Sequence, residues 1–103
     1  MVNLVVTMII KEGRMKDFLL ECARIRPLVL AEKGCIAYDY CRDIPSPLPI
    51  QEPVNPNRIT LIERWASMED LAAHSAAPHM KEYGPRVKDL RESVSARVLE
   101  GIF

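Results

Sequence analysis

The chain has 103 residues, with 14 Lys or Arg residues against 14 Asp or Glu residues, so its formal net charge is zero. The length predicts a single domain, and the balanced charge argues against nucleic acid or an anionic membrane as a partner. The longest apolar run, residues 4–10, is far shorter than the roughly 20 residues that cross a bilayer, and it lacks the pattern of a signal peptide. We therefore expect a cytoplasmic protein.

Three cysteines, Cys22, Cys35 and Cys41, show no C-x-x-C spacing. An odd number without that spacing fits neither a disulfide framework nor a zinc knuckle. Free cysteine usually packs as a small apolar side chain, so we expect reduced thiols with a packing role.

Hydrophobic periodicity predicts a strand, a helix and a second strand in the first half of the chain. Apolar residues occupy the even positions of residues 2–10, which is typical of a strand. Over residues 14–33 they recur every three or four positions, which predicts a long amphipathic helix that ends before Gly34. Residues 35–42 alternate again and predict the second strand.

Five of the eight prolines fall within residues 43–58. Each proline lacks a backbone donor and restricts the residue before it, so neither a helix nor a paired strand is expected there. The sequence predicts one long loop, of the kind that often forms a lid or a binding loop.

In the second half, residues 59–66 alternate as a third strand. Ser67 and Asp70 have the spacing of a capping box, which predicts a short helix ending at about Ser75. Pro78 suits the first turn of a further helix, and residues 94–101 alternate as a fourth strand. The order β-α-β-β-α-β predicts the ferredoxin-like α+β fold, an antiparallel sheet with helices on one face.

Apolar residues also occupy strand positions opposite the core set, at Val5, Ile9, Ile62, Ala66 and Leu99. A bare sheet face of this kind would be a larger apolar patch than monomers normally expose. We expect a homodimer that packs sheet on sheet.

Four residues, Glu63, Trp65, His74 and His79, are the strongest candidates for a functional site. Glu63 and Trp65 share one face of the third strand, where a buried carboxylate needs a partner or a raised pKa. Imidazole titrates near neutrality, so the histidines are candidates for proton transfer. The alternative roles are a structural ion pair for Glu63, core packing for Trp65, and capping or surface positions for the histidines. No further ligands accompany the two histidines, so we predict no metal site.

Three tyrosines, Tyr38, Tyr40 and Tyr83, are either core aromatics or hydrogen-bond donors to a bound oxygen. Arg64 and Arg86 suit solvated or interface positions. Arg86 could instead reach the anionic part of a substrate.

Several segments taken together resemble the antibiotic biosynthesis monooxygenase (ABM) family. They are Lys11-Glu12-Gly13, Gly34-Cys35-Ile36-Ala37-Tyr38, the pattern Glu63-x-Trp65-x-Ser67 followed by His74, and Pro78-His79. The resemblance extends through nearly the whole chain. It implies a dimeric, ferredoxin-like α/β barrel with a pocket between the sheet and the helices of each protomer.

The resemblance also implies an activity, because enzymes of this family are mostly cofactor-independent oxygenases of quinols and phenols. We therefore expect a monooxygenase that uses dioxygen on a small aromatic quinol or phenol, without a cofactor. In this interpretation His74 assists deprotonation, and Glu63 orients it. Trp65 and Tyr38 form an aromatic wall, and the further substrate-binding residues are His79, Tyr83 and Arg86.

The sequence departs from the family pattern at two places. Val6 stands where the haem-degrading branch has asparagine, which argues against haem cleavage, and the proline-rich loop is longer than the family leads us to expect. Two other functions stay open. One is that of an isomerase branch acting on small phosphorylated sugars, which the absence of a phosphate cradle disfavours; the other is a non-catalytic ligand-binding or stress-response dimer.

Overall fold

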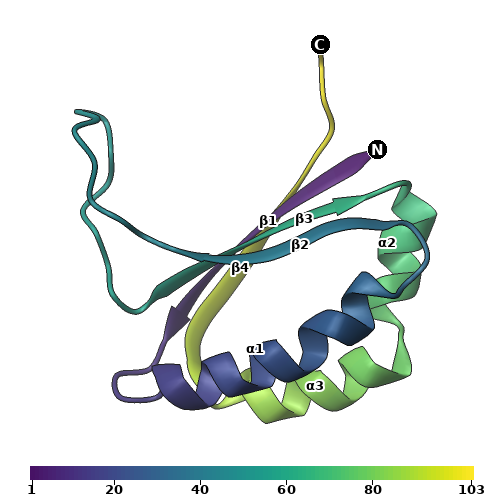
Figure 1. The fold of residues 1–103 in the computed structure, drawn as a ribbon, viewed down its shortest axis with the longest axis horizontal. Helices are drawn as coiled ribbons and strands as arrows, with labels where there is room; N and C mark the ends of the chain where they lie inside the picture. Colours follow the sequence, from purple (N-terminus) through teal and green to yellow (C-terminus); the bar gives the residue numbers. More distant parts are fainter.

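A computed structural model describes residues 1–103 and contains four strands and three helices (Figure 1). In chain order they are β1 (Val2–Ile10), α1 (Met15–Leu30), β2 (Cys35–Arg42), β3 (Arg58–Trp65), α2 (Met68–Ser75), α3 (Pro78–Lys88) and β4 (Arg91–Leu99). The predicted ferredoxin-like α+β arrangement, with its second helical region in two parts, is confirmed.

The four strands form one antiparallel sheet in the order β2-β3-β1-β4. β1 lies at the centre, where Leu4 pairs with Glu63 of β3 and with Val98 of β4. Directly opposite residues of antiparallel strands project from the same face of a sheet. The register therefore places Glu63 on the same face as the even-numbered apolar residues of β1.

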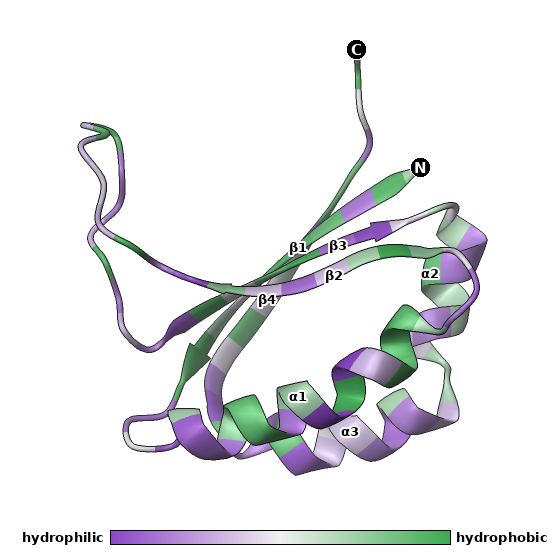
Figure 2. Ribbon diagram, in the orientation of Figure 1, coloured by the Kyte–Doolittle hydropathy of each residue, from purple (hydrophilic) through white to green (hydrophobic).

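All three helices lie on one side of the sheet (Figure 1). The sheet and the helices enclose an apolar core, to which α1 contributes buried residues at the helical spacing of four, three and four: Phe18, Cys22, Ile25 and Val29. This spacing places them along one face of the helix. Figure 2 shows the hydrophobic and hydrophilic segments alternating along α1 and α3.

The local signals for α2 and α3 acted as predicted. Ser67 caps α2, because its Oγ accepts a hydrogen bond from the Asp70 backbone N–H at 3.1 Å. Pro78 is the first residue of α3. None of the helices is both long and apolar enough to cross a bilayer.

Two predicted elements differ from the structure by two residues or more at an end, and the third strand is shifted by one residue, to 58–65. α1 ends at Leu30 rather than near Lys33, because the Glu32 N–H bonds the Val29 carbonyl at 2.9 Å and turns the chain early. β4 covers 91–99 rather than 94–101, since its pairing with β1 begins opposite Ile10 and its last partner is Asn3. A strand continues only where its neighbour supplies partners.

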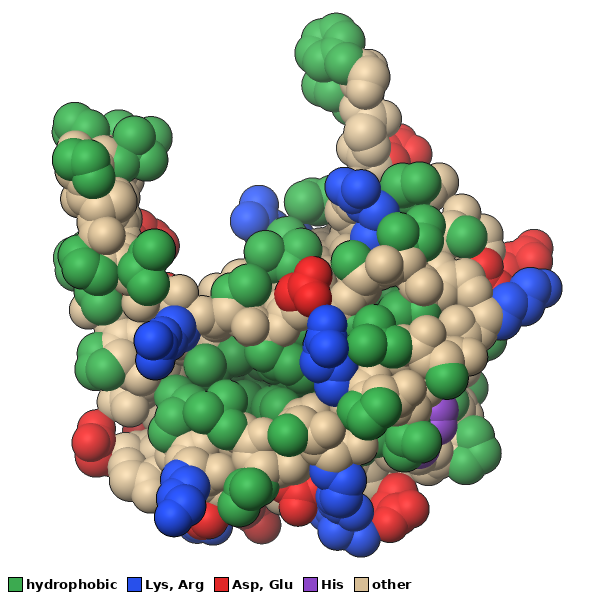
Figure 3. Space-filling view, in the orientation of Figure 1, with side chains coloured by type: hydrophobic (Ala, Val, Ile, Leu, Met, Phe, Trp, Pro, Cys, Tyr) green, Lys and Arg blue, Asp and Glu red, His purple; other side chains and the backbone are tan.

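Two segments project from the sheet on the side away from the helices, namely the loop 43–57 and the C-terminal residues 100–103 (Figure 1). The predicted loop is confirmed, and it is anchored by the ion pair of Arg58 with Asp43 at 2.8 Å. Figure 3 shows apolar side chains gathered at the tips of both segments. The exposed apolar residues there are Ile44, Leu48, Ile50, Val54, Ile102 and Phe103.

Candidate functional site

β3 places Glu63 and Trp65 on the face of the sheet that the helices cover. They are two residues apart on one strand, so they share a face. Trp65 has no exposed surface and Glu63 is 3% exposed. The indole N–H donates to Glu63 Oε1 at 2.9 Å, which gives the buried carboxylate one neutral donor.

α2 delivers His74 to the same place. The side chain is buried, and its ring lies against the indole of Trp65 with the centroids 4.6 Å apart. The ring of Tyr38 packs against the same imidazole in an edge-to-face arrangement, with ring centroids 5.7 Å apart. His74 Nε2 lies 3.9 Å from Glu63 Oε1, which is an ion-pair distance and longer than a hydrogen bond. Four of the predicted site residues thus form one buried group.

A fifth residue, Glu32, connects this group to His79. Its Oε2 lies 2.8 Å from Nδ1 of His74 and 2.8 Å from Nε2 of His79. Glu32 sits in the turn between α1 and β2, where the Cys35 N–H bonds its carbonyl at 3.2 Å. The turn is further fixed by Gly34, whose φ of +79° suits glycine and which packs directly against the Asp70 side chain.

Burial is the main influence on the pKa of Glu63 and raises it above the ordinary value. The hydrogen bond from Trp65 and the positive charge of a protonated His74 act in the opposite direction, and Glu32 adds to the increase. Removal from water disfavours the charged form of a carboxyl, and a donor or a cation restores it. Glu63 is therefore more easily protonated than a surface glutamate.

A second polar group lies between α3 and β2. The hydroxyl of Tyr83 is 3.4 Å from that of Tyr40 and 3.7 Å from the Cys22 sulfur. Burial raises the pKa of both tyrosines, and it raises the pKa of Cys22 to about 11 despite the hydrogen bond with Tyr83. These groups stay protonated at neutral pH, so Cys22 is a poor nucleophile.

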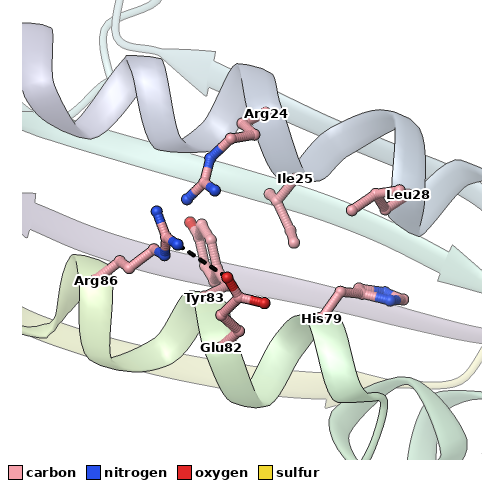
Figure 4. Close-up of a pocket in the computed structure, with 7 residues that line it drawn as sticks. All are labelled: Arg24, Ile25, Leu28, His79, Glu82, Tyr83 and Arg86. Carbon is pink, nitrogen blue, oxygen red and sulfur yellow. Dashed lines mark hydrogen bonds and ion pairs between the residues drawn. The ribbon is translucent and has the colours of Figure 1, made fainter.

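A cleft of about 50 Å³ opens between α1 and α3 (Figure 4). Ile25 and Leu28 of α1 face His79 and Tyr83 of α3 across it. The cleft is completed by three charged side chains: Arg24, Glu82 and Arg86. The Arg86 guanidinium donates to Glu82 at 2.8 Å, and Arg24 pairs with Glu21.

The structure thus divides the predicted site residues into two sets. Four of them are buried and line no cavity, namely Glu63, Trp65, His74 and Tyr38. The other three line the cleft, namely His79, Tyr83 and Arg86. Two larger hollows, of about 290 and 470 Å³, lie elsewhere, and none of the predicted catalytic or substrate-binding residues lines them. No three His, Cys, Asp or Glu side chains form a group that could hold a metal ion.

Residues 1–86 match the antibiotic biosynthesis monooxygenase family, ABM. The chain belongs to this family. It is 37% identical over 78 residues to the "Probable quinol monooxygenase YgiN" of Escherichia coli (strain K12), a match that covers 76% of this chain and 74% of the relative.

Solved structures share the ABM-type fold at lower sequence identity. A conserved protein from Methanosarcina mazei Go1 superposes with a TM-score of 0.84 at 21% identity, covering 96% of this chain and 90% of the other. Rv0793 from Mycobacterium tuberculosis gives a TM-score of 0.83 at 20% identity, covering 99% and 95%. At such identities the comparison concerns the fold.

Within this ABM chain, Glu32 is the residue that sequence reasoning missed. It is one of 14 acidic residues, it lies near the end of the helix predicted over residues 14–33, and it belongs to none of the motifs. Its only local signal is its place two residues before Gly34, at the point where the helix was expected to end. Its two partners are 42 and 47 residues away, so no spacing rule relates them.

Proposed function

We propose that this ABM protein is a cofactor-independent monooxygenase that oxidises a small aromatic quinol or phenol with dioxygen. The observation that carries the proposal is the continuous contact from the cleft to the buried carboxylate, through His79, Glu32, His74 and Glu63. Membership in the ABM family and the similarity to a protein named as a quinol monooxygenase support it.

In this proposal the substrate's hydroxyl group enters the cleft between α1 and α3. His79 accepts the hydroxyl proton, Ile25 and Leu28 contact the ring, and Arg86 lies where it can attract the resulting anion. The cleft is smaller than the 300 Å³ or more that typical ligand sites occupy, so the two helices must separate to admit a bicyclic ring. Trp65 and Tyr38 do not line the cleft; they pack against the His74 ring and fix its orientation.

The anion supplies the electrons of the reaction. For a quinol, one atom of dioxygen is inserted at a ring C–H and the other leaves as water, so that quinol plus dioxygen gives a hydroxyquinone plus water. No external reductant is needed for this balance. The protein's contribution is to remove the proton, exclude water and stabilise the anion.

We also propose that the working unit is a cytoplasmic homodimer joined through the open sheet faces. The loop 43–57 and the C-terminal residues both extend beyond that face (Figure 1) and end in apolar side chains (Figure 3). The face itself carries exposed Ile62 and Leu99. A second copy would cover these side chains and place the projecting segments against its own surface.

The test of the activity is oxygen uptake by the purified, metal-free protein with menadiol. We expect uptake above the uncatalysed rate, and a decrease in kcat/KM on the order of 10²- to 10⁴-fold in His79→Gln, the effect typical of a lost general base. Glu69→Gln is the control. It removes an exposed carboxylate of α2 that does not take part in the contacts among His79, Glu32, His74 and Glu63. Absence of uptake with any quinol or phenol, together with tight binding of a small aromatic, would support the non-catalytic alternative.

A further inference from the structure

The most unusual contact in the chain is one carboxylate oxygen shared by two imidazoles. Glu32 Oε2 is 2.8 Å from Nδ1 of His74 and 2.8 Å from Nε2 of His79, although Oε1 of the same carboxylate has no hydrogen-bond partner. The side chains of Glu32 and His74 are 14% and 7% exposed, whereas that of His79 is 26% exposed. The shared oxygen therefore lies between a buried ring and a ring at the cleft.

An ionised carboxylate can only accept hydrogen bonds. Both imidazole nitrogens that face Glu32 must then carry hydrogen, which fixes His74 as the Nδ1–H form and His79 as the Nε2–H form. In neutral His79 the other nitrogen, Nδ1, keeps its lone pair, and no protein atom bonds to it. The ring that lines the cleft is thereby left with one nitrogen able to accept a proton.

We propose that Glu32 is a positioning residue of the active site, which holds His79 in the tautomer whose Nδ1 can take a proton from a hydroxyl in the cleft. This inference rests on the proposed function and names a residue of the same site. When the substrate O–H bond breaks, a new N–H bond forms at Nδ1 and the substrate keeps the electron pair. The positive imidazolium then lies 2.8 Å from the negative Glu32 carboxylate, as in a carboxylate–histidine pair that orients a base.

His74 has a separate role in this arrangement. It donates to the same Glu32 oxygen and lies against Trp65, so it prevents the carboxylate from turning away from His79. The backbone supports Glu32 as well, through the Glu32 N–H bond to Val29 and the bond that its carbonyl accepts from Cys35. Glu32 therefore has a fixed backbone and a side chain held from two directions.

The test combines a spectroscopic and a kinetic measurement. The chain has only two histidines, so ¹⁵N NMR of its imidazoles, assigned with His79→Gln, reports both tautomers directly in the neutral-imidazole limit of a pH titration. We expect Nε2–H for His79 and Nδ1–H for His74 in the wild-type chain, and a mixture of tautomers at His79 in Glu32→Gln. The opposite tautomer at His79 in the wild type would overturn the proposal.

With menadiol, Glu32→Gln is expected to lower kcat on the order of 10²- to 10⁴-fold and to leave KM unchanged, because Glu32 does not line the cleft. Glu69→Gln is again the control. If Glu32→Gln does not fold, Glu32→Asp replaces it, since its carboxylate is one methylene too short to reach both rings, and the same loss is expected. Unchanged tautomers and unchanged kcat in a folded variant contradict the proposal. If the wild type consumes no oxygen, the activity is refuted while the NMR result still decides whether Glu32 sets the tautomer.

Discussion

The two faces of the sheet differ in how completely one chain covers them. On the face that the helices cover, Met8, Leu61 and Trp65 are buried. No buried side-chain nitrogen or oxygen lacks a hydrogen-bond partner. On the opposite face Ile62 is 46% exposed, and Arg64 bonds only Asn3 of the neighbouring strand. The helices bury the apolar side chains of one face within a single chain, whereas apolar side chains of the open face, such as Ile62, remain exposed.

Because of this difference, the face on which a strand residue lies decides whether its side chain is buried, even against its polarity. Ile62 and Glu63 are neighbours on β3, yet the apolar side chain is exposed and the carboxylate is buried. Strand alternation puts them on opposite faces, and the helices cover only one of those faces. Three changes test this assignment, beginning with the largest expected effect.

Ile62→Lys places an ammonium group in the centre of the open face. If that face is a homodimer interface, the charge has to be buried without a partner, and the dissociation constant should increase on the order of 10³-fold. Analytical ultracentrifugation at micromolar concentration should then find the 11.7 kDa chain in place of a species of twice that mass.

The matched control is Leu20→Lys, a change of the same type at a side chain of α1 that is 63% exposed. It should leave the sedimentation of the wild type unchanged, because α1 lies on the other side of the sheet. Equal behaviour of the two variants, or a monomeric wild type, would show that the open face is not an interface.

Trp65→Phe tests the completeness of the helix-covered face. The change removes the only N–H that donates to Glu63 and reduces a fully buried ring, so we expect the free energy of unfolding to decrease by about 2–3 kcal/mol. Urea denaturation measures the loss. In the Glu63→Gln background the same change should cost less, since the acceptor is no longer charged, and strictly additive losses would mean that the hydrogen bond has no role.

Glu63→Gln has the smallest expected effect, and its sign depends on pH. Because burial raises the pKa of folded Glu63, the folded wild type binds a proton more tightly than the unfolded chain. The contribution of this group to stability is complete below the ordinary glutamate pKa, and it is lost as pH rises through the raised value. The wild type should thus gain stability relative to Glu63→Gln as pH falls.

Parallel urea titrations of the two chains across this range measure the difference, which removes most of the contribution of the other acidic groups. The polar groups that influence the pKa of Glu63 are the Trp65 indole, His74 and Glu32, and they are the same in both chains. A difference that is constant with pH, or one of the opposite sign, would contradict the raised pKa.

The sequence by itself determined the elements of this fold and the faces of its strands. The periodicity of two along β3 assigned Glu63 and Trp65 to one side, and Ser67 and Pro78 marked the starts of two helices. These features depend on neighbouring residues, so they can be predicted from a short window. The motif around Glu63, Trp65 and His74 also pointed to the ABM family, which the family comparison confirmed.

Only the tertiary structure decided which of these residues meet and which of them reach a cavity. Glu32 contacts two histidines more than 40 positions away, and the split between buried His74 and cleft-lining His79 depends on how α3 packs against α1. The ends of α1 and β4 likewise depended on a turn and on a partner strand. Contacts between distant segments arise from packing the whole chain, which local periodicity does not encode.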